Sequence, residues 1–202
     1  MMATAHRIGD TTFSTPSDRE IMIPRAFLAP RRRVFEALTD PGHVPHWYGP
    51  RGWTLPVRAI DFRPRGAWRF VCRGPDGTEM GMRGVYREIT PPERFVSTES
   101  FDDYPGESLN TLVLAEEDGR TTITTTVQYP SPEVRDAVLG TGMRDGAAQT
   151  YDRLAEYLRS MACGPPDQGR GEWGCCRCLR SRRPDLGAVS WPVPARRISS
   201  GP

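Results

Sequence analysis

The residues with the most obvious capacity for chemistry lie in the stretch HVPHWYGPRGW, from His43 to Trp53. His43 and His46 are three positions apart, so a helical turn would bring both imidazoles to one side, as two zinc ligands require. Zinc needs further ligands, and the nearby Asp40 and the N-terminal His6 are the obvious candidates. This set is too sparse, so we expect no metal here and interpret both histidines as surface residues of a loop.

Cysteines near the end of the chain form a second group that could bind a metal: Cys163, Cys175, Cys176 and Cys178. Zinc sites usually combine two C-x-x-C pairs, whereas these thiols form C-C-x-C with one distant cysteine. We expect them to remain reduced and unstructured under cytosolic redox conditions. Cys72 lies beside aromatic residues in a strand-like run, so we interpret it as a packed core thiol rather than a nucleophile.

The templates of the common enzyme classes are absent from the sequence. The chain has no lysine, which excludes Schiff-base chemistry, a Walker-type phosphate lysine and a Ser-Lys dyad. It has no G-x-S-x-G elbow and no Gly-rich phosphate loop that opens a helix. We therefore predict no cofactor and no catalytic residue, and we expect a binding protein rather than an enzyme.

Glu99 keeps an enzymatic interpretation open. A carboxylate inside an apolar cavity has a raised pKa and can act as a general acid or base. The alternation around Glu99 leaves its direction open, and an outward-facing glutamate is the ordinary case. An enzyme that uses Glu99 or a tyrosine therefore stays an alternative.

Composition divides the 202 residues into three parts. Residues 1–18 are polar and without a period, which predicts a flexible N-terminal arm. Residues 163–202 are rich in Pro, Gly, Arg and Cys, which predicts a disordered tail. Residues 19–162 carry regular apolar patterns and predict a single domain.

Charge and hydropathy exclude two classes of partner. The net charge is +2, and basic residues of the patterned part are interleaved with acidic ones, so we expect no nucleic-acid partner. No apolar run approaches the roughly 18 to 20 residues of a membrane span, and the N-terminus lacks the apolar region of a signal peptide. We therefore expect no membrane partner and a cytoplasmic location.

The apolar patterns of residues 19–162 predict an α+β fold. Residues 19–29 predict a strand that Pro24 assigns to a sheet edge or a bulge, and residues 30–40 predict a helix that Pro30 opens. Residues 40–50, with Asp40 as cap, predict one distorted helical turn, because Pro45 interrupts it. Alternating runs with Gly- or Pro-containing connectors then predict an antiparallel meander of six strands, at 55–62, 66–73, 79–89, 94–101, 108–117 and 120–129.

A long helix is predicted to complete the fold. Ser131 and Pro132 form a good helix start, and an apolar stripe runs from Val134 to Met161. Gly140 and its neighbouring glycines weaken the first half of this helix. The order of elements therefore predicts a curved antiparallel sheet of about seven strands that wraps around one long C-terminal helix, with two short helices after the first strand.

Five motifs resemble, in order and spacing, a known family: FEALTDPGHVPHWYGPRGWT, DFRPRGAWRFVCRGPDG, GVYREITPPERFV, EEDGRTTITTTV and DRLAEYL. They are similar to bacterial stand-alone domains that resemble the C-terminal domain of the activator of heat-shock-protein-90 ATPase. This group belongs to the START-like, or SRPBCC (Bet v 1-like), helix-grip superfamily, and the resemblance spans residues 19–161. It implies the helix-grip fold, whose members include lipid carriers, hormone receptors, polyketide cyclases and co-chaperone domains.

The chain departs from that family at informative positions. Arg65 precedes Gly66 where relatives commonly have two glycines, so the turn can differ in type. Ala147 stands where relatives often have a tryptophan, which would widen a cavity beneath the last helix. Ser97 and Glu99 occupy a strand where large aromatic residues are expected to face inward.

Strand alternation and the resemblance together predict an apolar cavity between the sheet and the last helix. Trp47 is expected to close its mouth. The alternative is a solid core without a cavity. The residues predicted to contact a ligand are Trp47, Trp68, Phe70, Met82, Tyr86, Phe101, Leu112, Met143, Ala147 and Tyr151.

The predicted function is the binding of a small apolar or aromatic molecule, with Tyr86, Tyr151 or an arginine at its polar end. The resemblance implies two alternatives. One is a domain that interacts with a heat-shock chaperone, although relatives that do so carry a separate N-terminal domain and residues 1–18 are too short for one. The other is a polyketide cyclase-like or hydrolase-like enzyme in the same cavity. The sequence allows a monomer or a homodimer.

Overall fold

A seven-stranded antiparallel sheet forms the body of the computed structural model, which describes residues 5–103 and 106–162. The strand order is β3-β9-β8-β7-β6-β5-β4, and successive hairpins join β4 through β9. The strands are β3 (Glu20–Phe27), β4 (Thr54–Ile60), β5 (Ala67–Arg73), β6 (Glu79–Thr90), β7 (Arg94–Phe101), β8 (Ser108–Glu117) and β9 (Arg120–Gln128). The α+β class and the meander are as the sequence predicted.

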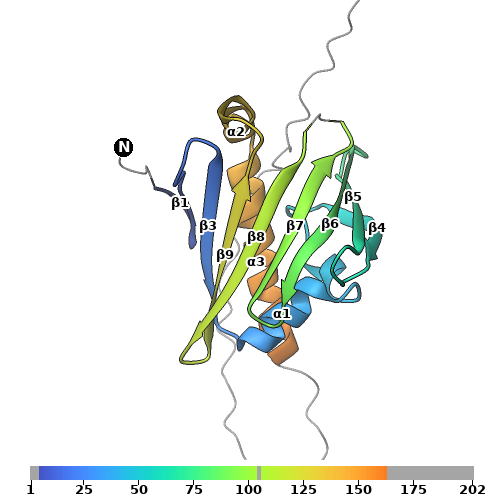
Figure 1. Cartoon of the computed structure of the whole chain (residues 1–202). Helices are drawn as coiled ribbons and strands as arrows, with labels where there is room; N and C mark the ends of the chain where they lie inside the picture. The colour runs from blue at the N-terminus through green and yellow to red at the C-terminus, as the bar shows by residue number, and fades with distance from the viewer. Residues whose placement is uncertain (1–4, 104–105, 163–202) are drawn as a thin grey trace, which may run out of the picture.

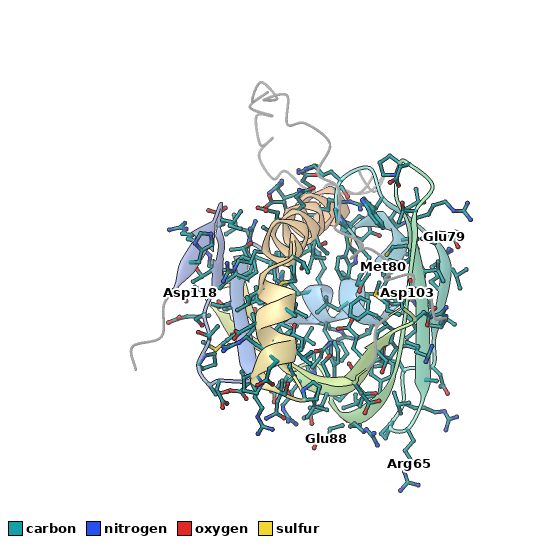
Figure 2. All side chains as sticks on the ribbon, turned by 90° about the horizontal axis from the view of Figure 1, so that it is seen from above. Arg65, Glu79, Met80, Glu88, Asp103 and Asp118 are labelled. Atoms are coloured by element: carbon teal, nitrogen blue, oxygen red, sulfur yellow. The ribbon has the colours of Figure 1, made fainter. Side chains whose placement is uncertain are left out.

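Helices cover one face of this sheet. They are α1 (Arg31–Thr39), a 3-10 turn η1 (Val44–His46), α2 (Pro132–Leu139) and α3 (Met143–Ala162). In Figure 1, α3 lies behind the middle strands and α1 crosses near its lower end. Figure 2 shows the sheet curving around the interior, with α3 on the open side and with Met80 turned inward while Glu79 points outward.

The sequence predicted the edge strand correctly and the distorted turn in part. Pro24 lies in β3, which is an edge strand of the seven-stranded sheet. The predicted distorted turn is η1, but its cap is His43, whereas the Asp40 carboxylate accepts a hydrogen bond from the backbone N–H of Gly42 at 2.6 Å. Pro45 therefore limits this segment to a single turn.

The predicted long C-terminal helix is two helices. Ser131 caps α2 as expected, since its hydroxyl accepts from the backbone N–H of Val134, but α2 ends before Gly140. The chain then restarts at Met143, whose N–H donates to the hydroxyl of Thr141 at 3.2 Å. Glycine and threonine disfavour helix interiors and favour such a break, so the apolar stripe is divided between α2 and α3.

The turn between β4 and β5 contains two residues with unusual backbone geometry or close contacts, Arg65 and Gly66. Arg65 has φ +69°, the left-handed region that glycine favours, so the chain places an arginine where relatives commonly have glycine. At Gly66, a Cβ atom would come within 2.0 Å of the carbonyl oxygen of Asp61. Backbone hydrogen bonds from Arg65 N–H to the Tyr86 carbonyl and from Tyr86 N–H to the Gly66 carbonyl then attach this turn to β6.

The structure of residues 5–18 differs from the sequence prediction. Residues 5–18 were expected within a flexible arm, yet β1 (His6–Ile8) and β2 (Thr11–Phe13) form an antiparallel hairpin. Phe13 is 1% exposed and packs with Ile21, Ile23 and Ala148 in a second apolar cluster beside the main core. Burial of this aromatic ring orders the hairpin, although its strands are too short to show a period.

Arg25 connects this hairpin to α3. Its side chain on β3 is 5% exposed and donates to the Thr11 hydroxyl and to the Asp152 carboxylate, both at 2.8 Å. The guanidinium also lies 5.8 Å from the ring centroid of Phe27. One buried cation therefore joins β2, β3 and α3.

We predict that Arg25→Met destabilises the fold by about 2 kcal/mol, because it leaves Thr11 and Asp152 without their donor while Asp152 retains contact with water. Chemical denaturation measures this change in the free energy of unfolding. The matched control is Arg63→Met, which removes an exposed ion pair to Asp61 and should cost less than about 0.5 kcal/mol. Equal effects of the two substitutions would contradict the role given to Arg25.

Candidate functional site

The interior between the sheet and α3 is packed unevenly. Near α1 the inner face is solid, where Phe95, Leu114 and Ile123 are 7%, 1% and 0% exposed. Farther along the same strands, inner-face side chains keep accessible surface. We call this region the open end of the interior and define it by Glu99, Phe101, Asn110 and Tyr151, with Leu112, which pairs with Phe95 across β7 and β8, at its border.

Strand alternation places these residues on the inner face. Glu99 and Phe101 share the parity of buried Phe95 on β7, and Asn110 and Leu112 share that of buried Leu114 on β8. Solvent reaches an inner side chain only where packing is incomplete. The inner face is therefore more accessible to solvent at the open end than near α1.

Half of the residues predicted to contact a ligand belong to the solid core instead: Trp47, Trp68, Phe70, Met82 and Tyr86, each less than 9% exposed. Trp47 was expected at the mouth of the cavity, but its indole N–H donates to the Ala37 carbonyl at 2.9 Å beneath α1. Tyr86 lies in an aromatic cluster, with the ring centroid of Phe62 at 4.9 Å. All five side chains are members of the main apolar core.

The other half of the predicted residues keep partial exposure: Phe101, Leu112, Met143, Ala147 and Tyr151. Phe101, Leu112 and Tyr151 pack against the main core, whereas Met143 and Ala147, together with Tyr151, pack against the second apolar cluster. The Tyr151 and Thr125 hydroxyls are 2.7 Å apart, and Thr125 pairs with Leu112 in the β8–β9 register. Ala147 lies one helical turn before Tyr151, so both residues present side chains to the same side of α3.

Glu99 points inward, which the sequence had left open, and its partner is Asn110 on the adjacent strand. The Asn110 side-chain Nδ2 donates to Glu99 Oε2 at 3.1 Å. Burial raises the pKa of Glu99, and the hydrogen bond from Asn110 opposes that rise only in part. No residue in the described ranges forms an ion pair with Glu99.

Two tyrosines near this carboxylate were missed from the sequence. Burial, together with the charge of Glu99, raises the pKa of Tyr48 and of Tyr129 above the ordinary tyrosine value. The Tyr48 hydroxyl donates to the sulfur of Met82 at 3.1 Å, and both tyrosines keep partial exposure. Tyr129 lies two residues after the buried Val127, so strand alternation could have predicted that its side chain points inward. Tyr48 follows a turn, where the sequence has no regular spacing that could predict the direction of a side chain.

Both histidines contact Tyr157 of α3. The His46 ring stacks on Tyr157 with centroids 5.0 Å apart, and His43 Nδ1 lies 2.6 Å from the Tyr157 hydroxyl. Among the described residues, no group of three or more potential ligand side chains could hold a metal ion. His46 is exposed, as the sequence predicted.

A surface pocket of about 520 Å³ adjoins these histidines, lined by His46, Arg51, Gly52, Arg153, Glu156, Tyr157 and Ser160. Its charged groups already have partners. Arg51 pairs with Glu156 at 2.6 Å, and Arg153 donates to the backbone carbonyls of Tyr48, Gly49 and Pro50. This pocket therefore offers little unused hydrogen-bonding capacity to a ligand.

Cys72 is the packed thiol that the sequence predicted. It is 0% exposed in the core, and burial raises the pKa of its thiol to about 12. A thiol with this pKa stays protonated at neutral pH and is a poor nucleophile. The tail cysteines lie outside the described residues.

The Glu99 carboxyl should make stability depend on pH. Because burial raises its pKa above the ordinary 4.5 in the folded protein, the folded state keeps this proton to a higher pH than the unfolded chain does. Wild type therefore loses stability as pH rises from 4.5 through the raised pKa, and Glu99→Gln removes this loss.

We expect the gain in unfolding free energy from Glu99→Gln to be larger at about pH 8 than at about pH 4, as measured by urea denaturation. The control is Glu88→Gln, since Glu88 is exposed on β6. A difference between Glu99→Gln and wild type that is the same at both pH values would disprove the buried, raised-pKa carboxyl.

Comparison with known proteins agrees with this fold. None of the curated proteins compared with the chain matches it. A protein from Rhodobacter sphaeroides is 31% identical, with 74% of this chain and 98% of that one covered and a TM-score of 0.69. A Mycobacterium smegmatis protein (24% identity, 79% and 99% covered, TM-score 0.66) and an Arthrobacter aurescens protein (20%, 84% and 98%, 0.67) share the fold.

The helices in the described part of the chain lack the length and apolar character that crossing a lipid bilayer demands.

The family described as Activator of Hsp90 ATPase homolog 1-like protein matches residues 28–159, which include α1, the meander and most of α3. The chain therefore belongs to the Activator of Hsp90 ATPase homolog 1-like family, within the SRPBCC helix-grip superfamily.

Proposed function

We propose that this protein binds a small apolar or aromatic molecule at the open end of the interior, between β7, β8 and α3. The observation that supports this proposal is the contrast along the inner face. The side chains near α1 are buried, whereas those of the open end keep accessible surface. Apolar and aromatic walls with a few polar atoms are typical of small-molecule sites.

The walls of the proposed site come from both layers. Phe101 and Leu112 supply apolar surface from the sheet, and Ala147 and Tyr151 supply it from α3. Phe101, Leu112 and Tyr151 pack against the buried core, so they rest on well-packed side chains. A rigid support of this kind holds a site in shape before a ligand arrives.

Filling the site should abolish binding. We expect Ala147→Trp to weaken the binding of the neutral fluorescent probe N-phenyl-1-naphthylamine at least about tenfold, because an indole would occupy the ligand's space. The matched control is Ala137→Trp, since Ala137 is exposed on α2. Leu112→Trp repeats the test from the opposite wall.

Fluorescence titration gives the affinities, and thermal unfolding shows that the variants remain folded. Saturable binding by the wild type that survives both Ala147→Trp and Leu112→Trp would place the ligand elsewhere. Absence of saturable binding by the wild type at micromolar concentrations would refute the proposed function.

A second candidate function has one specific observation in its favour. The description of the matching family names an activator of a chaperone ATPase. Under this alternative, the chain would bind a heat-shock-protein-90 chaperone and raise its rate of ATP hydrolysis.

If small-molecule binding is the function, the chain should leave the chaperone's ATPase rate unchanged, because a ligand held between sheet and helix requires no partner surface. A pull-down with the chaperone and a steady-state ATPase assay test this. Micromolar binding together with an increased ATPase rate would favour the chaperone function instead.

A further inference from the structure

We infer that the Glu99–Asn110 pair is the polar end of the proposed site, and that the ligand is an amphiphilic amine, with an apolar or aromatic body and one ammonium group. This inference rests on the proposed function. It goes further by naming the chemical class of the ligand. The argument has three parts: unused acceptors, uncompensated charge and aromatic surroundings.

The pair uses one of the two N–H groups of Asn110 Nδ2 for its own hydrogen bond and leaves the Asn110 carbonyl oxygen without a partner among the described residues. Asn110 Nδ2 already donates to Glu99 Oε2, and the Asn110 carbonyl oxygen Oδ1 is buried without a hydrogen-bond partner. The amide orientation follows from this bond, because the reverse orientation would bring two acceptors together. Ser108 donates its hydroxyl to the backbone carbonyl of Glu99, not to the carboxylate.

Unpaired buried acceptors are costly, and native proteins contain few of them. A ligand that donates hydrogen bonds would satisfy the Asn110 Oδ1 and the remaining Glu99 oxygen. An ammonium group carries up to three N–H donors and can serve both acceptors together. A hydroxyl group has one donor and can serve only one of them.

Charge favours the same group. The Arg side chains of the described ranges form many ion pairs, yet none of these pairs involves Glu99. A partly buried carboxylate without a cation is unfavourable, so a bound cation would stabilise it. An anionic ligand would be repelled at the same position.

The surrounding rings suit a cation as well. Tyr48, Tyr129 and Tyr151 border this end of the interior, and the hydroxyls of Tyr48 and Tyr151 are engaged with Met82 and Thr125. A ligand at this end would therefore contact aromatic side chains whose hydroxyls, for Tyr48 and Tyr151, already have partners. Aromatic faces attract ammonium groups, most strongly where water is excluded.

Three probes with one aromatic body test the inference: 1-naphthylmethylamine, 1-naphthylmethanol and 1-naphthoate. Isothermal titration of the full chain near neutral pH gives each affinity. We expect the wild type to bind the amine about tenfold more tightly than the alcohol and the carboxylate least, because only the amine forms charge-assisted hydrogen bonds.

The variant Glu99→Gln keeps the shape of the side chain and removes its charge. It should reduce amine binding to the level of the alcohol and leave alcohol binding within about twofold. The control is Glu88→Gln, which lies on the same sheet with its side chain pointing outward (Figure 2) and should preserve the tenfold preference.

The outcomes separate this inference from the proposed function. Equal binding of the amine and the alcohol by the wild type would overturn the inference while the proposed function stands. Preference for the amine that persists in Glu99→Gln would also overturn it. Failure of all three probes to bind the wild type would overturn both. The wild-type series decides the question even if a variant does not fold.

Discussion

A sheet of seven strands is about 29 Å across, whereas a helix with its side chains is only about 10 to 12 Å wide. The apolar inner face of this sheet therefore cannot be covered by α3 alone, however long the helix is. The sheet curves around α3, and the remaining surface is covered by α1, by η1 and by large side chains. The distribution of these extra elements along the sheet determines where the interior is solid.

Near α1 the inner face of the sheet is fully covered by the additional helices and large side chains. Phe35 of α1 packs edge-on against Phe95 at 6.3 Å, and Trp47 finds a hydrogen-bond partner in the Ala37 carbonyl. At the open end the helix beside α3 is α2 (Figure 1), none of whose residues is buried, and polar side chains replace the aromatic residues expected on β7. The same constraint thus accounts for both the solid core and the proposed site.

The sequence predicted the elements whose signal is local. Strand alternation and Gly- or Pro-containing connectors lie within a few residues, so all six strands of the meander were predicted close to their observed bounds. The N-terminal hairpin was missed, because three-residue strands show no period and its order depends on the distant partners of Phe13 and Arg25.

The burial of the residues predicted for the site was harder to read from the sequence, for a related reason. Trp47 was expected at the mouth of a cavity but is buried beneath α1. The local spacing of residues does not show whether a side chain lies at the opening of the interior or deep inside it. Asn110 was missed because its hydrogen bond to Glu99 depends on the register of β7 with β8, which places Asn110 opposite Ser97 and beside Glu99. Such pairing is a property of the assembled sheet.

The central claim is that a ligand lies between the sheet and α3 at the open end of the interior. The most direct measurement is methyl-detected NMR of the protein saturated with N-phenyl-1-naphthylamine, with intermolecular nuclear Overhauser effects assigned to residues. The account predicts effects from the probe to the methyl groups of Leu112, Ala147 and Met143. Effects confined to residues of the surface pocket beside Tyr157, with none to Leu112 or Ala147, would contradict it.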